Sequence, residues 1–263
     1  ESPITPKNAK TQAIAIWALG TASQNNPKVK EVVLGSNVMD ILVSNLKANI
    51  TTLPVHGGAA AAADDDHNGV DNGDDEGLNA SLAFLHGKVL YALSASMDSY
   101  VSLQEQFWDL GGASAVINVW AKSLNHLKRQ KEEPEGATAA SAVVGSVSEH
   151  HSVVRKSLGL ATRMIKGRDV DPELFSKGLI GVWLGSPALC SLTIESLEIG
   201  MGSERVAETT LEFVEVLLKH SPACLTDVRE RFSQQLDNLS AQYDGDESEE
   251  MRLRIQALKA KMG

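Results

Sequence analysis

The sequence of 263 residues has few aromatic side chains and little basic charge. Aromatic residues make up 5% of the chain and strand-like alternation is absent, which argues against a β sandwich. No apolar run approaches the about 18 residues that span a bilayer, so we expect a soluble chain with no membrane partner. The formal net charge of -10 also disfavours nucleic acid, because phosphate binding depends on clustered Lys and Arg.

Cysteine is scarce as well. The chain has two, Cys190 and Cys224, which are too few for a metal framework or a disulfide scaffold. One disulfide between them would close a loop of about 35 residues, and two buried free thiols are the alternative. The pair is therefore a disulfide candidate.

The chain also lacks the short motifs of common catalytic sites. A Walker loop, His-Glu-x-x-His and Gly-x-Ser-x-Gly are all missing. Gly200-Met201-Gly202-Ser203 resembles part of a nucleotide loop, but it precedes a helical pattern, so we interpret Ser203 as a helix cap. His150-His151 stands at an expected helix start and is interpreted as a solvated pair. We therefore expect a protein that is not an enzyme, with no catalytic residue, cofactor or metal site.

What the sequence does contain is one internal repeat. Trp17-Ala18-Leu19 returns as Tyr91-Ala92-Leu93 at an offset of 74 residues, and Leu34-Gly35 returns as Leu110-Gly111 at an offset of 76. Each unit reads as helix, turn, short helix, glycine and helix, which is the pattern of an armadillo or HEAT-type solenoid. A plain helical bundle with one chance similarity is the alternative. We expect an all-α solenoid of about four repeats with terminal capping helices, a single domain over 1–263.

Two segments without helical periodicity interrupt the predicted helices. The first unit covers about 9–47 and the second about 78–125. Residues 54–77 consist largely of His, Gly, Ala and acidic residues, which cannot bury enough apolar surface to offset ordering, so we expect a disordered insert. Residues 131–146, rich in Glu, Gly, Ala and Ser, are predicted to be a flexible link.

Apolar side chains at helical spacing form stripes on the predicted helices. In the first helix the stripe consists of Ile14, Trp17, Ala18 and Thr21. The second unit begins with Leu78, Leu82, Leu85, Val89 and Leu93. Near the C terminus the stripes are Leu225, Val228, Phe232, Leu236, Leu239 and Tyr243, and then Met251, Ile255, Leu258 and Met262. The last helix, with one apolar and one charged face, suits a solenoid cap.

The corner motifs carry a family resemblance. The segment 18–29, Ala-Leu-Gly-Thr-Ala-Ser-Gln-Asn-Asn-Pro-Lys-Val, is similar to the signature corner of the armadillo-type nucleotide exchange factors of 70-kDa heat-shock chaperones. Segments 88–93 and 106–112 resemble the next repeat of that family. Gly181-Val182-Trp183, Cys190 and the tail from Leu236 to Tyr243 look closer to the endoplasmic-reticulum branch than to the cytosolic branch. The acidic insert departs from the family pattern and leaves the number of units open.

The resemblance implies a binding protein. Members of the family bind the ATPase domain of an Hsp70-type chaperone and favour an open form that holds ADP poorly, so the expected function is nucleotide exchange, with BiP as the expected partner. No cofactor is implied, and we expect a monomer. A cytosolic exchange factor of the same fold and an armadillo scaffold that holds extended peptides are the alternatives.

The expected location, the endoplasmic reticulum lumen with the cytoplasm as the alternative, is argued indirectly. The first residue is Glu and no signal-peptide pattern follows, so we expect a processed or truncated chain. Three acceptor triplets, at Asn49, Asn79 and Asn238, are glycosylation candidates if the chain is secretory.

The expected partner surface is the face lined by the third helix of each unit. In the first unit Val38, Ile41 and Leu42 are predicted to face inward, which leaves a polar stripe of Asp40, Ser44 and Lys47. At the offset of 76 residues, the equivalents of Ser44 and Lys47 are Trp120 and Ser123. Trp120 is then either an aromatic anchor for the partner or a residue packed against a neighbouring unit.

Overall fold

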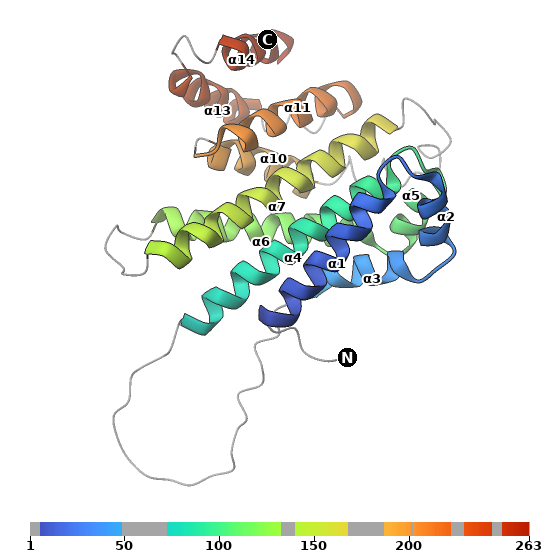
Figure 1. Cartoon of the computed structure of the whole chain (residues 1–263). Helices are drawn as coiled ribbons and strands as arrows, with labels where there is room; N and C mark the ends of the chain where they lie inside the picture. Colours follow the sequence, from blue (N-terminus) through green and yellow to red (C-terminus); the bar gives the residue numbers. More distant parts are fainter. Residues whose placement is uncertain are drawn as a thin grey trace, which may run out of the picture.

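The computed structural model describes residues 6–48, 73–132, 140–167, 187–200, 202–221, 229–243 and 249–262. Every regular element in these ranges is an α-helix, as the pattern of the repeat predicts (Figure 1). The first six are α1 (Pro6–Ser23), α2 (Pro27–Leu34), α3 (Val38–Lys47), α4 (Gly73–Met97), α5 (Val101–Asp109) and α6 (Gly112–Glu132). The others are α7 (Ala140–Gly167), α10 (Pro187–Gly200), α11 (Glu204–His220), α13 (Arg229–Gln242) and α14 (Glu249–Met262).

The predicted corner after the first helix is confirmed. Asn26 is the N-cap of α2, and its side chain accepts a hydrogen bond from the backbone N–H of Val29 at 3.4 Å. Pro27 occupies the first turn, where its missing N–H costs nothing. Gly35 is the C-cap and ends the helix.

The internal repeat is visible in the backbone. Asn25, after α1, and Ser99, after α4, both have φ of 56°. Among the described residues they are the two positions other than glycine with positive φ, and they are related by the sequence offset of 74. Gly111, at the corner between α5 and α6, has φ of 71°, a conformation that glycine adopts without steric penalty. The turn after the first helix thus has the same positive φ in both units, whereas Gly35, the sequence equivalent of Gly111, has φ of -79°.

The helices pack in two series. In one, α1 packs on α4, α4 on α7 and α7 on α11. In the other, α3 packs on α6, α6 on α10 and α10 on α13, while α14 contacts both α11 and α13. The helices α1, α4 and α7 lie side by side with similar directions, and the short helices α2 and α5 meet near one end of them (Figure 1).

One continuous apolar core lies between the two series, joined by contacts of α6 with α7 and of α10 with α11. Its largest fully buried side chains include Trp120, Phe107, Phe213 and Phe232. Ion pairs connect neighbouring helices at the surface, for example Lys128 with Glu195 at 2.9 Å, between α6 and α10. Successive helices of both series therefore share this core.

The predicted disordered insert, 54–77, and the predicted flexible link, 131–146, both extend too far into neighbouring helices. Residues 73–77, assigned to the disordered insert, form the start of α4. Residues 131–132 belong to α6 and residues 140–146 belong to α7, so the predicted link of 131–146 is shorter. The acidic sequence at 74–76 suits a helix start, because the helix dipole favours negative charge there. The remaining residues of both segments lie outside the described ranges.

Most apolar stripes identify the buried faces correctly. The members that are buried as predicted are Leu82, Leu85, Val89, Leu93, Phe232, Leu236, Leu239, Tyr243, Met251, Ile255 and Leu258. Met262 is partly buried against the core. Leu78, Leu225 and Val228 lie where no side chain is described.

The stripe on α1 is an exception. Ile14 and Trp17 are 61% and 49% exposed, and α1 instead buries a face that carries mostly small residues, namely Ala9, Ala13, Ile16, Gly20 and Ser23. A Cβ on Gly20 would lie 2.8 Å from the Tyr91 ring and 2.9 Å from Cα of Ala92. Small side chains therefore allow α1 to approach α4 closely, and the larger ones remain outside.

Candidate partner-binding site

The polar stripe predicted on α3 is at the surface. Asp40, Ser44 and Lys47 are exposed, and the Lys47 Nζ donates a hydrogen bond to the Leu110 carbonyl oxygen at 2.7 Å. Ile41 was expected to face inward but is 48% exposed, whereas Leu42 is 1% exposed. The prediction for Ile41 is wrong because the buried face of α3 is formed by Met39, Leu42, Val43 and Leu46.

Trp120 and Ser123 do not extend this surface. Trp120 is fully buried, its Nε1 donates to the Ser196 Oγ at 2.9 Å, and its ring meets Phe213 edge to face at 6.0 Å. Ser123 is 3% exposed and lies 3.2 Å from the Nδ1 of His150. Both predictions as partner contacts are therefore wrong, because α7, α10 and α11 cover this side of α6. Trp120 is instead a packed residue, as the alternative predicted, in contact with α10 and α11.

The histidine pair is not solvated as predicted. His150 is 8% exposed, and its ring stacks on that of His126 with centroids 4.0 Å apart. His126 in turn has its Nε2 3.1 Å from the Ser146 Oγ. The Nε2 atoms of His150 and of His86, on α4, are buried without a hydrogen-bond partner. The structure thus places three imidazoles near one another where α4, α6 and α7 meet.

Burial keeps two of these imidazoles neutral. Desolvation, followed by the charge of Lys122, lowers the pKa of His86 to about 4. Desolvation, followed by the neighbouring histidines, lowers the pKa of His150 to about 3. Desolvation also lowers the pKa of His151. Such groups are structural near neutral pH and charge only under acid conditions.

A groove lies between α4 and α7. Its larger part, of about 540 Å³, is lined by α4, α7, the corner after α1, and Thr209 of α11. Its smaller part, of about 360 Å³, is lined by α4, α5 and α7. The two parts share Ser94, Asp98, Leu160 and Arg163, so they form one continuous feature.

The larger part of the groove is cationic. It contains Arg155, Lys156 and Arg163 from α7, and the Lys156 Nζ donates to the Gly87 carbonyl oxygen at 2.9 Å. Desolvation, then the charges of Lys88 and Arg155, lowers the pKa of Lys156 to about 8, while Glu149 acts in the opposite direction. Positive charge is thus concentrated in a chain whose net charge is -10.

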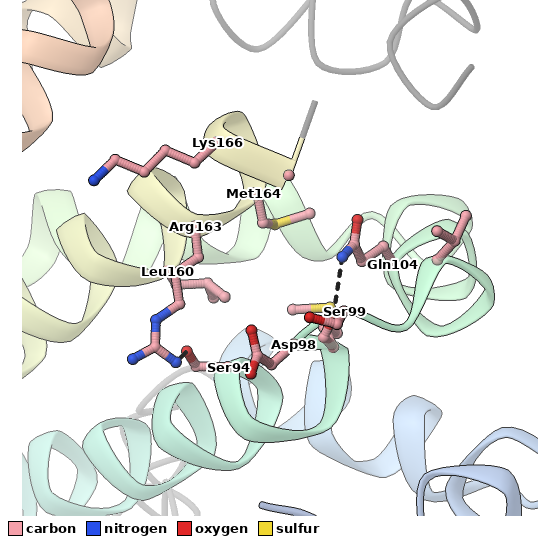
Figure 2. Close-up of a pocket in the computed structure, with 11 residues that line it drawn as sticks. Ser94, Asp98, Ser99, Gln104, Leu160, Arg163, Met164 and Lys166 are labelled. Atoms are coloured by element: carbon pink, nitrogen blue, oxygen red, sulfur yellow. Dashed lines mark hydrogen bonds between the residues drawn. The ribbon is translucent and has the colours of Figure 1, made fainter. Parts of the chain in front are cut away.

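The smaller part of the groove is mainly apolar. Met97, Leu160 and Met164 are among its lining residues (Figure 2). At its edge the Arg163 Nη1 donates to the Ser94 Oγ at 2.8 Å, and the Gln104 Nε2 donates to the Met97 carbonyl oxygen at 2.9 Å (Figure 2). These hydrogen bonds fix two polar side chains at the rim.

This groove was not predicted from the sequence. A signal was present, because Arg155, Gly159 and Arg163 recur every four residues and share one face of a helix. A Cβ on Gly159 would meet nothing within 4 Å, so this face of α7 is open between the two arginines. Which helix lies opposite could not be deduced from the spacing.

The other residues singled out from the sequence have varied positions. Asn79 is half-buried on α4 and Asn238 is exposed on α13, while Asn49 lies outside the described residues. Cys190 is disulfide-bonded, but Cys224 also lies outside the described residues, so their pairing stays a prediction. Ser203 is the N-cap of α11, as predicted, with no hydrogen bond from its side chain.

No group of three or more His, Cys, Asp or Glu side chains in the described part of the chain is placed to hold a metal ion. None of the described helices combines the length and the apolar character needed to cross a membrane. The groove between α4 and α7 is the candidate site because it combines a surface depression with clustered cationic side chains.

Comparison of the chain with models of protein families, with curated proteins and with solved structures finds no match.

Proposed function

We propose that the protein is a nucleotide exchange factor that binds the ATPase domain of an Hsp70-type chaperone and promotes ADP release. The observation that carries the proposal is the repeated corner. Its sequence resembles that family, and Asn25 and Ser99 have the same positive φ. The proposed fold is an armadillo-like solenoid of about four units. The two series of successively packed helices support it.

The proposed units begin at the short helices. Each short helix, α2 or α5, is followed by two longer ones, which gives the triplets α2–α3–α4 and α5–α6–α7. In this frame the third helices are α4 and α7, not α3 and α6. The partner-binding face then lies on the series α1, α4, α7 and α11, and its groove is the proposed centre of the interface.

BiP in the endoplasmic reticulum lumen remains the proposed partner. The disulfide at Cys190 favours an oxidising compartment, because structural disulfides are rare in the cytosol. The cytosolic exchange factor of the same fold is the nearest alternative. A scaffold for extended peptides is a further alternative, since the same groove would serve it.

The proposal needs no chemistry by this chain. A partner that favours a chaperone form with weak ADP affinity must itself be displaced by nucleotide, because coupling between sites is reciprocal. A coupling free energy of about 1 to 3 kcal/mol corresponds to an about 5- to 150-fold change in affinity.

Stopped-flow measurement of labelled ADP release from BiP tests the proposal. We expect release to accelerate with rising concentration of this protein, and excess ADP to dissociate the complex. The ATPase domain of a cytosolic Hsp70, measured in parallel, separates the two compartments. An unchanged release rate for both chaperones at saturating protein would refute the function.

A further inference from the structure

The groove between α4 and α7 has a charge pattern that points to the chemistry of its ligand. Four of its lining residues are cationic, namely Arg155, Lys156, Arg163 and Lys166. Among the described lining residues, Asp98 is the single carboxylate. Lys166 is paired with Glu212 on α11 at 2.7 Å, which leaves the excess of positive charge at the other three.

These cations are positioned before any ligand binds. Lys156 is held by the Gly87 carbonyl oxygen and Arg163 by the Ser94 hydroxyl, and both acceptors are neutral. Between Arg155 and Arg163 the surface of α7 is bare at Gly159, so a bound chain can approach the helix backbone. Apart from Asp98, the described lining residues provide no carboxylate to balance Arg155, Lys156 and Arg163.

The smaller, apolar part of the groove indicates that the ligand also carries an apolar group. Met97, Leu160 and Met164 are each at most 2% exposed and form its floor. Methionine side chains are flexible and polarizable, and they adapt to apolar groups of different shape. A small inorganic anion would leave this part of the groove unused, whereas a polypeptide could fill both parts.

We infer that the groove binds an acidic segment of a partner protein that carries a large apolar side chain near its carboxylate. The carboxylate lies between Arg155 and Arg163, and the apolar side chain lies against Met97 and Met164. This assigns a recognition chemistry to the face used in the proposed function, and it rests on that function only for the identity of the partner.

Nuclear magnetic resonance of the ¹⁵N-labelled full chain tests the inference without a chaperone. The probe is the peptide acetyl-Glu-Glu-Gly-Leu-Gly-amide, and the matched control replaces both Glu residues with Gln. We expect saturable amide shifts at Ser94, Gly159 and Met164 with the acidic peptide, and about tenfold weaker binding of the control. Higher salt is expected to weaken binding of the acidic peptide more than binding of the control peptide, because salt screens exposed charges.

Charge reversal on this chain gives a second measurement. The variants Arg155→Glu and Arg163→Glu are each expected to lower the affinity for the acidic peptide about tenfold or more. Arg129→Glu, an exposed change of the same charge on α6, leaves its affinity unchanged. Unfolding midpoints of all three variants show whether each is folded. If a charge-reversal variant is unfolded, the neutral variants Arg155→Gln and Arg163→Gln are used instead. They are also expected to weaken binding of the acidic peptide.

The pH dependence provides a third readout. Lys156 faces Lys88, Arg155 and Glu149, and its lowered pKa of about 8 means that it loses its charge between neutral and alkaline pH. Affinity for the acidic peptide therefore falls from pH 7 to pH 9. Lys156→Arg removes this fall, because arginine stays charged throughout that range.

Several outcomes would overturn the inference. Equal affinity for the Glu and Gln peptides excludes charge recognition, and absence of shifts at millimolar peptide excludes the site. Inorganic phosphate that saturates the same amides as tightly as the peptide indicates a simple anion site. Shifts that depend on protein concentration alone indicate a second copy of this chain as the occupant. Peptide binding without accelerated ADP release would refute the exchange function and leave this inference standing.

Discussion

At the scale of single residues, Trp120 joins three helices. It lies on α6, donates a hydrogen bond to Ser196 on α10 and contacts the Phe213 ring on α11. An indole in such a position stabilises the fold through its buried volume and through one hydrogen bond. Substitutions can separate these two contributions to the free energy of unfolding.

Replacing Trp120 with Ala is expected to lower the free energy of unfolding by about 3 to 5 kcal/mol, because the side chain leaves a cavity. Trp120→Phe keeps a ring beside Phe213 but removes the donor to Ser196, and we expect a loss of about 1 to 2 kcal/mol. Urea unfolding of both variants measures the difference. A Trp120→Ala protein as stable as the parent would contradict the buried position.

The buried histidines predict an acid-sensitive stability. His86 and His150 have pKa values of about 4 and 3 in the folded protein, below the ordinary value of 6.5. The unfolded chain therefore binds more protons, and stability that is fully present above about pH 6.5 falls as pH decreases towards 4. Each group contributes a slope of about 1.4 kcal/mol per pH unit in that window.

Urea unfolding at about pH 7.5, 6.5, 5.5 and 4.5, in even steps across this window, checks the prediction. His150→Phe keeps a ring beside His126 but cannot be protonated, so we expect a shallower fall with acid, even if the variant is less stable at neutral pH. Parallel pH profiles for parent and variant would show that His150 has no role in acid sensitivity.

At the scale of elements, two helix glycines differ in what surrounds them. Gly20 on α1 lies against Tyr91 and the backbone at Ala92, whereas Gly159 on α7 faces open space. Both are in regular helices, so the intrinsic helix propensity changes equally when either becomes alanine. The difference between the two variants therefore reports helix packing alone.

Gly159→Ala is expected to raise the free energy of unfolding by about 0.5 to 1 kcal/mol, because alanine is the better helix former. Gly20→Ala is expected to lower it by about 1 to 3 kcal/mol, because its Cβ pushes α1 away from α4. Chemical denaturation of the two single variants gives both values. Equal stabilisation by both would mean that α1 does not approach α4 closely.

At the scale of the whole molecule, the packing of each helix on the next in its series makes the core continuous from α1 to α14. The segment 54–72 lies between α3 and α4 in the sequence, and its acidic, alanine-rich composition offers little apolar surface for a core.

Replacing residues 54–72 with a Gly-Ser linker of the same length is therefore expected to change the free energy of unfolding by less than about 0.5 kcal/mol. Retaining the length avoids any strain between α3 and α4. Thermal and urea unfolding compare the two proteins, and the ADP release assay compares their activity. A loss above about 2 kcal/mol would show that the segment packs against the helices.

The sequence by itself determined the helical class, the repeat and most of the buried stripes. Periodicity of 3.6 residues and turn residues such as Asn25, Pro27 and Gly35 act locally, so they can be recognised without a neighbour. The offset of 74 residues between the two copies of the repeat predicted the second unit, in which Ser99 has the same positive φ as Asn25. Local chemistry is sufficient to define an element and its ends.

Only the tertiary structure decided which faces are covered and where a partner can bind. Trp120 occupies the position equivalent to exposed Ser44, yet α10 and α11 cover it. Trp17 was part of the main stripe of α1, yet the small face at Gly20 makes the contact. Arg155 and Arg163 form a groove with α4 because two helices far apart in the sequence pack together. Burial is a property of such neighbours, and periodicity in one helix does not specify them.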